Sequence, residues 1–239
     1  MARFFVGVDD TDFGDSIGTG ALARELKVRL ERRLGVTCTG ITRHQLLVHP
    51  DIPYTSQNSS ACLEIEGAVE LGQVVQCARE LLDFLEHPGA DPGLCIFPVE
   101  QASAEISAFG RLAQTEVLRK AQAVQLASDS GVVLLELGGT GGGVIGALAA
   151  CGLRASGSDG RFISLPGIRD MKDVATVAEI LAATGVDRVV DERGTDVAAK
   201  QKISTRGWIR PNLVDFEARL LVREEDSRYR VVGKKEKDG

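Results

Sequence analysis

Hydrophobic positions along the chain alternate between a strand-like spacing of two and a helix-like spacing near four, which is typical of strands and helices in succession. The first apolar run, Phe4 to Val8, stops at a cluster of aspartates, as a buried strand would. The next periodic segment, Thr19 to Leu34, ends before Gly35, a common residue after a helix. Its leucines recur at every fourth position, on one helical face: Leu22, Leu26 and Leu30. The opening therefore predicts a strand, an acidic loop and a helix.

The same patterns continue to the C-terminal part of the chain. We predict strands over 36–48, 61–66, 94–99, 132–137 and 161–165, with further β-like segments at Val189, Trp208 and 216–222. We predict helices over 71–87, 144–151 and 171–184, and one long or two broken helices within 101–128. A polar turn over 49–60 joins the second and third strands. This succession predicts an α/β fold of the mixed α+β kind.

We place a soft domain boundary near Pro166, although no Ser-rich or charged linker marks it. The expected parts are a domain over 1–165, a smaller α+β portion over 166–232 and a charged, disordered tail over 233–239.

The composition and charge of the chain exclude several classes of protein. Hydrophobic residues make up 44% and charged residues 26%, values that exclude a disordered chain and a coiled coil. The formal charge of −6 gives no global attraction to nucleic acid, so any such site must be local. The basic run on the first helix fits a solvated face: Arg24, Lys27, Arg29, Arg32 and Arg33.

Location and redox state follow from two absences in the sequence. No apolar run reaches the roughly 18 residues of a membrane helix, and no signal-peptide pattern opens the chain, so we expect a cytoplasmic protein without membrane contact. The five cysteines are scattered and form no C-x-x-C pair. We expect small core residues rather than disulfides or a zinc ribbon.

The aspartate cluster is the first candidate for chemistry. Asp9, Asp10 and Asp12 follow the first strand, where side chains converge at the mouth of an α/β sheet. Clustered carboxylates repel one another, and a hard cation such as magnesium, shared with phosphate oxygens, relieves that repulsion. A solvated turn that caps the next helix is the competing interpretation.

Gly18, Thr19 and Gly20 lie where the first helix begins. Thr19 either caps that helix, a contribution of roughly 1 kcal/mol, or provides a hydroxyl nucleophile or phosphate contact beside a metal site.

The segment Gly141-x-Gly143-x-x-Gly146 matches a dinucleotide-binding fingerprint after a predicted strand. Its place in mid-chain, the early Gly152 in the following helix and the turn position of Asp159 all count against a Rossmann site. Gly141, Gly142 and Gly143 could instead let backbone N–H groups approach another phosphate or substrate, or serve close backbone packing.

The polar turn supplies further candidates. His44 and His49 flank its start and are candidate bases or substrate contacts, although isolated surface histidines are the commoner outcome. Asn58, Ser59 and Ser60 either bond a polar substrate or satisfy the turn.

Three segments in this order resemble one family, the archaeal agmatidine synthetases, which modify the wobble cytidine of an isoleucine tRNA. They are 6–12 (Val-Gly-Val-Asp-Asp-Thr-Asp) followed by Thr19, the 43–61 stretch with Asp-Ile-Pro-Tyr at 51–54, and 143–150 (Gly-Val-Ile-Gly-Ala-Leu-Ala-Ala). The resemblance covers roughly 1–165 and implies an ATP-using, kinase-like domain there, with a ferredoxin-like portion after it.

The resemblance also implies roles for residues. Asp9, Asp10 and Asp12 match the family's motif for magnesium and ATP, and Thr19 falls at a threonine that is itself phosphorylated. The implied chemistry activates a cytosine oxygen with phosphate and lets the amine agmatine displace it, with ATP consumed to AMP. Thr55-Ser56-Gln57 stand where the family has a basic segment, and no OB-fold or zinc ribbon fits within the chain.

We therefore expect an ATP-dependent phosphotransferase or phosphate-activating ligase in which the aspartates hold magnesium. The expected partners are ATP, a small-molecule or amine-containing co-substrate and possible tRNA. Two alternatives stay open at this point, a non-catalytic module that binds ATP or a metabolite and a Rossmann-type NAD(P)-binding oxidoreductase.

Overall fold

A computed structural model describes residues 1–9, 18–52, 58–84, 90–225 and 228–232. The chain forms two compact units, Met1–Ser156 and Gly157–Gly239. The division lies ten residues before the boundary expected near Pro166, because β6 (Arg161–Ser164) pairs with β10 (Asn212–Val214) of the second unit.

The first unit contains five strands and six helical segments in its described part. The strands are β1 (Ala2–Asp9), β2 (Thr37–Gln45), β3 (Ser59–Gly67), β4 (Gly93–Pro98) and β5 (Val133–Glu136). The helices are α1 (Thr19–Leu34), α2 (Leu71–Phe84), the short 3-10 helix η1 (Val99–Gln101), α3 (Ala104–Leu112), α4 (Lys120–Ser130) and α5 (Val144–Ala155). The mixed α+β class is confirmed, and the segment 101–128 breaks into two α-helices rather than one.

The sheet of this unit has the order β5-β4-β1-β3-β2, and each of these neighbouring pairs is antiparallel. A dinucleotide-binding fold needs parallel strands joined by crossover helices. The Rossmann alternative is therefore wrong for this unit. The expected convergence of side chains at one edge of the sheet also has a different cause: the end of β1 and the starts of β3 and β4 meet because these strands run in opposite directions.

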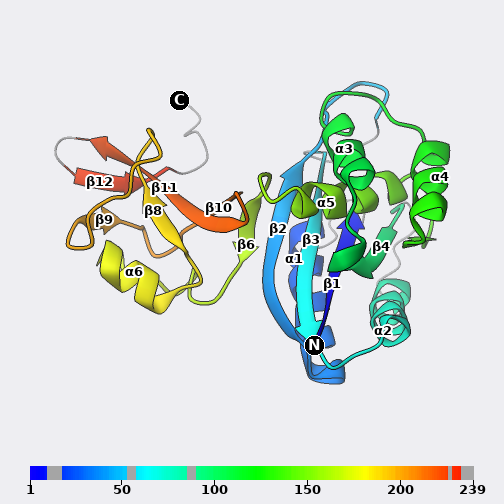
Figure 1. The fold of residues 1–239 in the computed structure, drawn as a ribbon, viewed down its shortest axis with the longest axis horizontal. Helices are drawn as coiled ribbons and strands as arrows, with labels where there is room; N and C mark the ends of the chain where they lie inside the picture. Colours follow the sequence, from blue (N-terminus) through cyan, green and yellow to red (C-terminus); the bar gives the residue numbers. More distant parts are fainter. Residues whose placement is uncertain (10–17, 53–57, 85–89, 226–227, 233–239) are drawn as a thin grey trace. The chain divides into compact units, whose positions relative to one another are not determined.

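Helices cover both faces of the sheet (Figure 1). Helix α5 packs along β1, β3 and β4, and α3 and α4 lie against α5 on the same side. Helix α1 buries Leu22, Leu26 and Leu30 toward the other face and ends at Gly35, whose φ of 65° is the left-handed conformation that glycine adopts readily. The leucine spacing thus predicts the buried side of α1 correctly.

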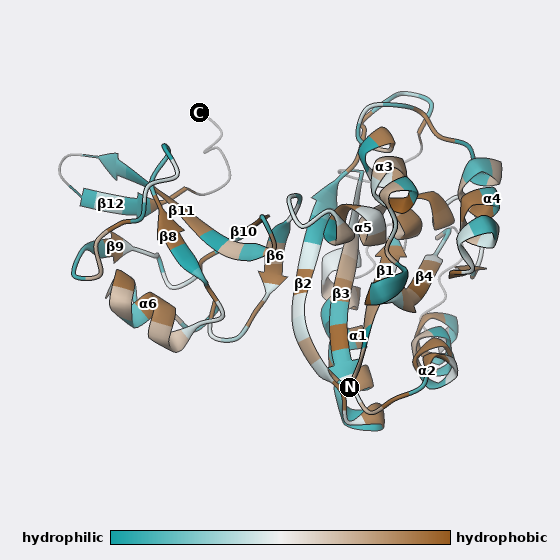
Figure 2. Cartoon of the chain, in the orientation of Figure 1, coloured by the Kyte–Doolittle hydropathy of each residue, from teal (hydrophilic) through white to brown (hydrophobic). Residues whose placement is uncertain are grey.

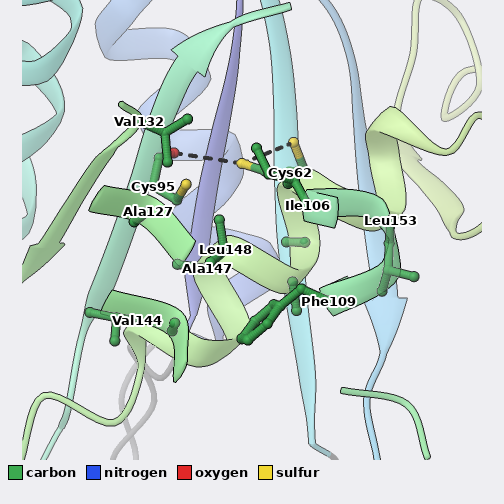
Figure 3. Packing of buried hydrophobic residues seen from close by; sticks show 14 of the residues in the cluster. Cys62, Cys95, Ile106, Phe109, Ala127, Val132, Val144, Ala147, Leu148 and Leu153 are labelled. Atoms are coloured by element: carbon green, nitrogen blue, oxygen red, sulfur yellow. Dashed lines mark hydrogen bonds between the residues drawn. The ribbon is translucent and has the colours of Figure 1, made fainter. Parts of the chain in front are cut away.

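The core between α5 and the sheet contains three of the five cysteines (Figure 3). The Sγ atoms of Cys62 and Cys151 lie 4.0 Å apart, and the Cys151 thiol also contacts the carbonyl of Cys95. Phe5 meets Phe97 edge to face, with ring centroids 5.9 Å apart. All five cysteines are buried and reduced, so the interpretation as small core residues is confirmed.

These thiols should not react in the folded protein. Burial raises the pKa of Cys151 well above its usual value and the pKa of Cys38 to about 12. Because the thiolate is the reactive form, we expect no fast reaction with a disulfide reagent at pH 8 in the native state and five equivalents of thiol in guanidinium. Fast native reaction of even one equivalent would contradict the buried arrangement.

The second unit is a separate α+β arrangement. Its strands are β6 (Arg161–Ser164), β7 (Val174–Thr176), β8 (Arg188–Val190), β9 (Lys202–Ser204), β10 (Asn212–Val214), β11 (Glu217–Glu225) and β12 (Arg228–Val231). They follow the order β6-β10-β11-β12-β9-β7, with β8 parallel to β11. Its helix is α6 (Val177–Ala183), which packs in an apolar cluster with Ile203 and Leu220. Figure 2 shows the apolar β4 of the first unit in brown and the polar β12 in teal.

Two expectations for this unit are corrected. The helix expected over 171–184 begins only at Val177, because Thr176 and Glu179 form a capping box that stops it from extending backward. Trp208, expected in a β-like segment, lies outside any strand. The guanidinium carbons of Arg210 and Arg169 lie 3.6 and 4.5 Å from the centroid of its ring.

Three further observations bear on the sequence expectations. In the described residues no helix is long and apolar enough to cross a bilayer. The basic face of α1 forms ion pairs, with Arg29 and Arg33 both on Glu80 of α2. The tail expected over 233–239 lies outside the described residues.

Candidate functional site

Three polar side chains come together in a row at one edge of the first sheet. His44 of β2 pairs directly with Ser60 of β3, and Asp9 of β1 pairs with Gly93 of β4. The register Val8 with Ala61, continued by one residue, sets Asp9 beside Ser60. Because directly opposed residues of antiparallel strands share a face, Asp9, Ser60 and His44 all point to the same side.

That side is the face covered by α5. Cys62, two residues after Ser60, contacts Cys151 of α5. A Cβ on Gly146, in the first turn of α5, would fall on the Asp9 carboxylate and 2.9 Å from Asp9 Cβ. The row therefore lies beneath the N-terminal end of α5, where the helix dipole favours a negative charge.

Buried polarity is concentrated at this edge. The buried polar or charged side chains of the described residues number eight. Four of them are at these strand ends, namely Asp9, His44, Ser59 and Ser60, and Thr42 lies beside His44 on β2. Burying such groups costs free energy unless they are bonded, and it is common where they serve binding or catalysis. The concentration makes this edge the candidate site.

His44 is fully buried, so the surface location that is common for an isolated histidine does not apply to it. Its Nε2 lies 2.8 Å from the hydroxyl of Thr42, a neighbour on the same face of β2. Ser60 is also fully buried, and its Oγ has no hydrogen-bond partner within the described part of the chain. Ser60 therefore has a hydroxyl available for a bound group.

Asn58 and Ser59 have structural partners. The Asn58 amide donates to the carbonyl of Leu47 at 2.7 Å, across the ends of the two strands. Ser59 Oγ accepts from Arg43 Nε at 2.9 Å and points to the opposite face from Ser60. His49 is half-buried, with its Nδ1 3.7 Å from Asp51 Oδ2. The structure thus separates Ser60 and His44, which join the row, from Asn58 and Ser59, which hold the hairpin.

The glycine loop over 138–143 lies at the same edge. A Cβ on Gly93 would overlap the backbone of Gly143, so these two glycines let the loop approach the strand beside Asp9. The helix behind the loop does not stop at Gly152: α5 continues to Ala155, because Gly152 lets it pack against the carbonyl of Ile106. This helix is longer than the sequence predicted.

Two N–H groups of the loop already have an anionic partner. Those of Gly141 and Gly142 donate to the carboxylate of Asp91, at 2.6 and 2.9 Å. Asp91 was not singled out from the sequence, and no local signal identifies it, because its partners lie about fifty residues away.

Thr19 is the first residue of α1 and is buried, whereas Gly18 is the cap and forms no side-chain cap bond. The capping interpretation of Thr19 is therefore wrong. Gly18 is exposed and Gly20 half-buried. Asp10 and Asp12 lie outside the described residues. In the residues that are described, no group of three carboxylate, His or Cys side chains could bind a metal.

The arrangement places one buried carboxylate, one hydroxyl and one imidazole side by side at a helix N-terminus. A carboxylate there can share a magnesium ion with phosphate oxygens, because magnesium often takes only one or two protein ligands. An imidazole and a hydroxyl can orient or deprotonate an acceptor.

Much of the chain is similar to known proteins, although no family model matches it. The chain is 30% identical over 155 residues, 63% of its length, to TiaS of Archaeoglobus fulgidus, a 2-agmatinylcytidine synthetase for an isoleucine tRNA. Among solved structures it is similar to a complex of TiaS with that tRNA and ATP, with 29% identity over 64% of this chain and a TM-score of 0.56. It is likewise similar to a complex of TiaS with the tRNA, AMPCPP and agmatine, with 27% identity over 63% and a TM-score of 0.55.

The match covers only part of these relatives, since the chain spans 36% of the length of each. The resemblance drawn from the three sequence segments is confirmed. Nearly two thirds of the chain is thus related to a part of the tRNA 2-agmatinylcytidine synthetases.

Proposed function

We propose that the first unit binds magnesium–ATP and uses it to activate an acceptor for attack by an amine, as an ATP-dependent ligase of the agmatidine synthetase type. The observation that carries the proposal is the similarity to structures solved with ATP or an ATP analogue, over close to two thirds of the chain. The buried row at the edge of the sheet agrees with it, because phosphoryl transfer requires charge neutralisation and positioning more than covalent chemistry.

In this proposal Asp9, together with Asp10 and Asp12, holds magnesium on the triphosphate. Thr19 takes up phosphate or lines the site, with Gly18 and Gly20 beside it. His44 and Ser60 orient the acceptor, because both are buried in the same row as Asp9. Asn58 and Ser59 support that row, and Gly143 brings the start of α5 close to it. A tRNA is the proposed acceptor and a small amine such as agmatine the co-substrate, as in the named complexes.

The first experiment incubates the protein with magnesium–ATP and follows the nucleotide and the intact protein by mass spectrometry. Formation of ADP or AMP that rises with an added amine and tRNA supports the ligase. Binding of ATP without turnover in any of these mixtures would leave a non-catalytic ATP-binding module instead.

Thermal unfolding tests the metal site. A ligand at a hundredfold excess over Kd adds about 2.7 kcal/mol to the free energy of unfolding, which corresponds to roughly 5–10 °C in Tm for a chain of this size. We expect this rise with magnesium–ATP but not with ATP in chelator, because the triphosphate would otherwise face the carboxylates directly.

Two variants identify the carboxylate responsible. Asp9→Asn should keep the fold and lose the magnesium–ATP shift, because it removes the buried charge that faces the metal. Asp129→Asn, at an exposed position on α4, makes the same change of charge elsewhere and should keep the whole shift. Equal shifts in both variants would remove Asp9 from the site.

Thr19 gives a second prediction, because it is buried at the first position of α1 and the cap position is Gly18. Thr19→Val should fold normally and lose at least about a hundredfold in turnover, whereas Thr19→Ser, which keeps the hydroxyl, should stay within about tenfold of the parent. Phosphate on the peptide 16–24 of the parent protein would locate the group. A fully active Thr19→Val enzyme would exclude Thr19 from the chemistry and leave the metal assignment standing.

A further inference from the structure

The carboxylate of Asp91 is hydrogen-bonded to the glycine loop over 138–143 and is not part of the row formed by Asp9, Ser60 and His44. Its Oδ1 accepts from the N–H of Gly141 at 2.6 Å, and its Oδ2 accepts from the N–H of Gly142 at 2.9 Å. The same Oδ2 also accepts from the hydroxyl of Thr140. One carboxylate thus bonds three consecutive residues, and hydrogen bonds to an ionised acceptor are about twice as strong as neutral ones.

The loop is shaped around this carboxylate. Gly139 and Gly141 have φ values of 55° and 77°, which turn successive N–H groups toward one anion. A Cβ on Gly139 would lie 3.0 Å from Asp91 Cγ, and one on Gly142 would lie 3.2 Å from Asp91 Oδ2. The glycines are therefore needed here for the approach of a side chain of the same protein.

The hydrogen bonds between Asp91 and the glycine loop lie close to Asp9 of the candidate site. Asp91 stands two residues before Gly93, which pairs with Asp9 and packs against the backbone of Gly143. Gly143 in turn is the N-cap of α5, and Gly146 in the first turn of this helix lies against Asp9. The Asp91 carboxylate ties the loop to the strand that borders Asp9.

We propose that Asp91 is a positioning residue: its carboxylate fills the anion-binding nest of the glycine loop and so fixes the N-terminal end of α5 over Asp9. The N–H groups of Gly141 and Gly142 therefore serve this anchor rather than a nucleotide, which the proposed function assigns to Asp9. The link to nucleotide binding rests on the proposed function, whereas the anchoring of the loop does not.

A second contact, independent of Asp91, binds a carbonyl group of the loop. Lys120 of α4 donates from Nζ to the carbonyl of Thr140 at 2.8 Å and pairs with Glu136 at 3.0 Å. Both partners of that ion pair are more than two-fifths exposed, and such pairs contribute little. We therefore expect the Asp91 bonds to dominate the order of the loop.

Small carboxylates give a direct test, because they fit the space that Asp91→Ala vacates. Amide hydrogen exchange is followed by mass spectrometry on peptides that contain residues 139–146. In Asp91→Ala we expect exchange of the Gly141 and Gly142 amides to speed up at least about tenfold and to slow again in sodium formate, but not in sodium chloride of equal ionic strength. The parent protein should not respond to formate.

Two further variants separate anchoring from general loss of stability. Asp91→Asn keeps the shape but sets an NH2 group against the N–H donors, so exchange should quicken without rescue by formate. Asp129→Ala removes an exposed acid from α4 and should exchange as the parent does. Slow exchange in Asp91→Ala, or no effect of formate on that variant, would overturn the proposal.

The same samples show whether the anchor serves the nucleotide. We expect the affinity of Asp91→Ala for magnesium–ATP to fall at least about tenfold and to recover in formate. If the parent binds no ATP, the proposed function fails while the exchange result still decides whether Asp91 anchors the loop. If the exchange result holds and ATP affinity is the same in Asp91→Ala as in the parent, the anchor has no part in nucleotide binding and the link to the site is wrong.

Discussion

Gly146→Ala is expected to lower the free energy of unfolding by roughly 1–3 kcal/mol and to abolish stabilisation by magnesium–ATP. An added Cβ would fall on the Asp9 carboxylate, and Asp9 has a short side chain that cannot swing clear, since its own Cβ is only 2.9 Å away. Either α5 or Asp9 must shift. Urea unfolding measures the first effect, and Tm with magnesium–ATP measures the second.

A matched glycine on another helix gives the control. Gly72, near the start of α2, has nothing within 4 Å of an added Cβ. Gly72→Ala should therefore be neutral or stabilising by up to about 1 kcal/mol, because alanine restricts the unfolded chain and favours a helix. If Gly146→Ala were as stable as Gly72→Ala and kept the magnesium–ATP shift, the close contact of Asp9 with α5 would be refuted.

Elements with a strong local signal could be predicted from the sequence. The leucines of α1 and the glycine after it give both the buried face and the end of the helix, and the first strand is clear from its unbroken apolar run. The start of α6 also has a local signal, because Thr176 and Glu179 form a capping box. The prediction from apolar periodicity did not use that signal and began the helix too early.

Elements whose signal lies elsewhere in the chain could not be predicted. Gly152 reads as a helix breaker, yet α5 runs through it because the carbonyl of Ile106 needs the space. The glycine fingerprint near Gly141 suggests a phosphate loop, yet two of its N–H groups bond Asp91, about fifty residues earlier. Close packing of this kind has no local pattern.

The candidate site shows the same division. The sequence predicts Asp9 after the first strand, His44 shortly before the polar turn and Ser60 within that turn, and strand register brings the three into one row. Register also separates Ser60 from Ser59, because adjacent residues on a strand face opposite sides. Thr42 was not expected, since a threonine within a strand is ordinary until its hydroxyl is seen 2.8 Å from His44.

Breaking the buried ion pair between Glu64 and Arg154 should have the largest effect on stability. Glu64 of β3 accepts from Arg154 of α5 at 2.7 Å, and the two side chains are only 7% and 10% exposed. Glu64→Gln removes the charge that compensates Arg154, so we expect a loss of about 3–5 kcal/mol in the free energy of unfolding by urea.

Arg3 supplies an internal control, because it bonds the same carboxylate from a side chain that is 53% exposed. Arg3→Gln should cost no more than about 1 kcal/mol, since water can replace most of that contact. A loss as large as that of Glu64→Gln would mean that Arg3, rather than Arg154, is the partner that compensates Glu64.

The double variant Glu64→Leu, Arg154→Met tests whether the ion pair itself stabilises the fold, or whether each charge is needed only because the other would otherwise be buried unpaired. Burying two charges costs several kcal/mol of desolvation, which their attraction only partly repays. Replacing both with apolar side chains of similar volume should therefore recover most of the stability that Glu64→Gln loses, because no charge is left unpaired beneath α5. If the double variant were less stable than Glu64→Gln, the pair would contribute more than the desolvation that it costs, and Arg154 would hold the C-terminal end of α5 by a bond that packing cannot replace.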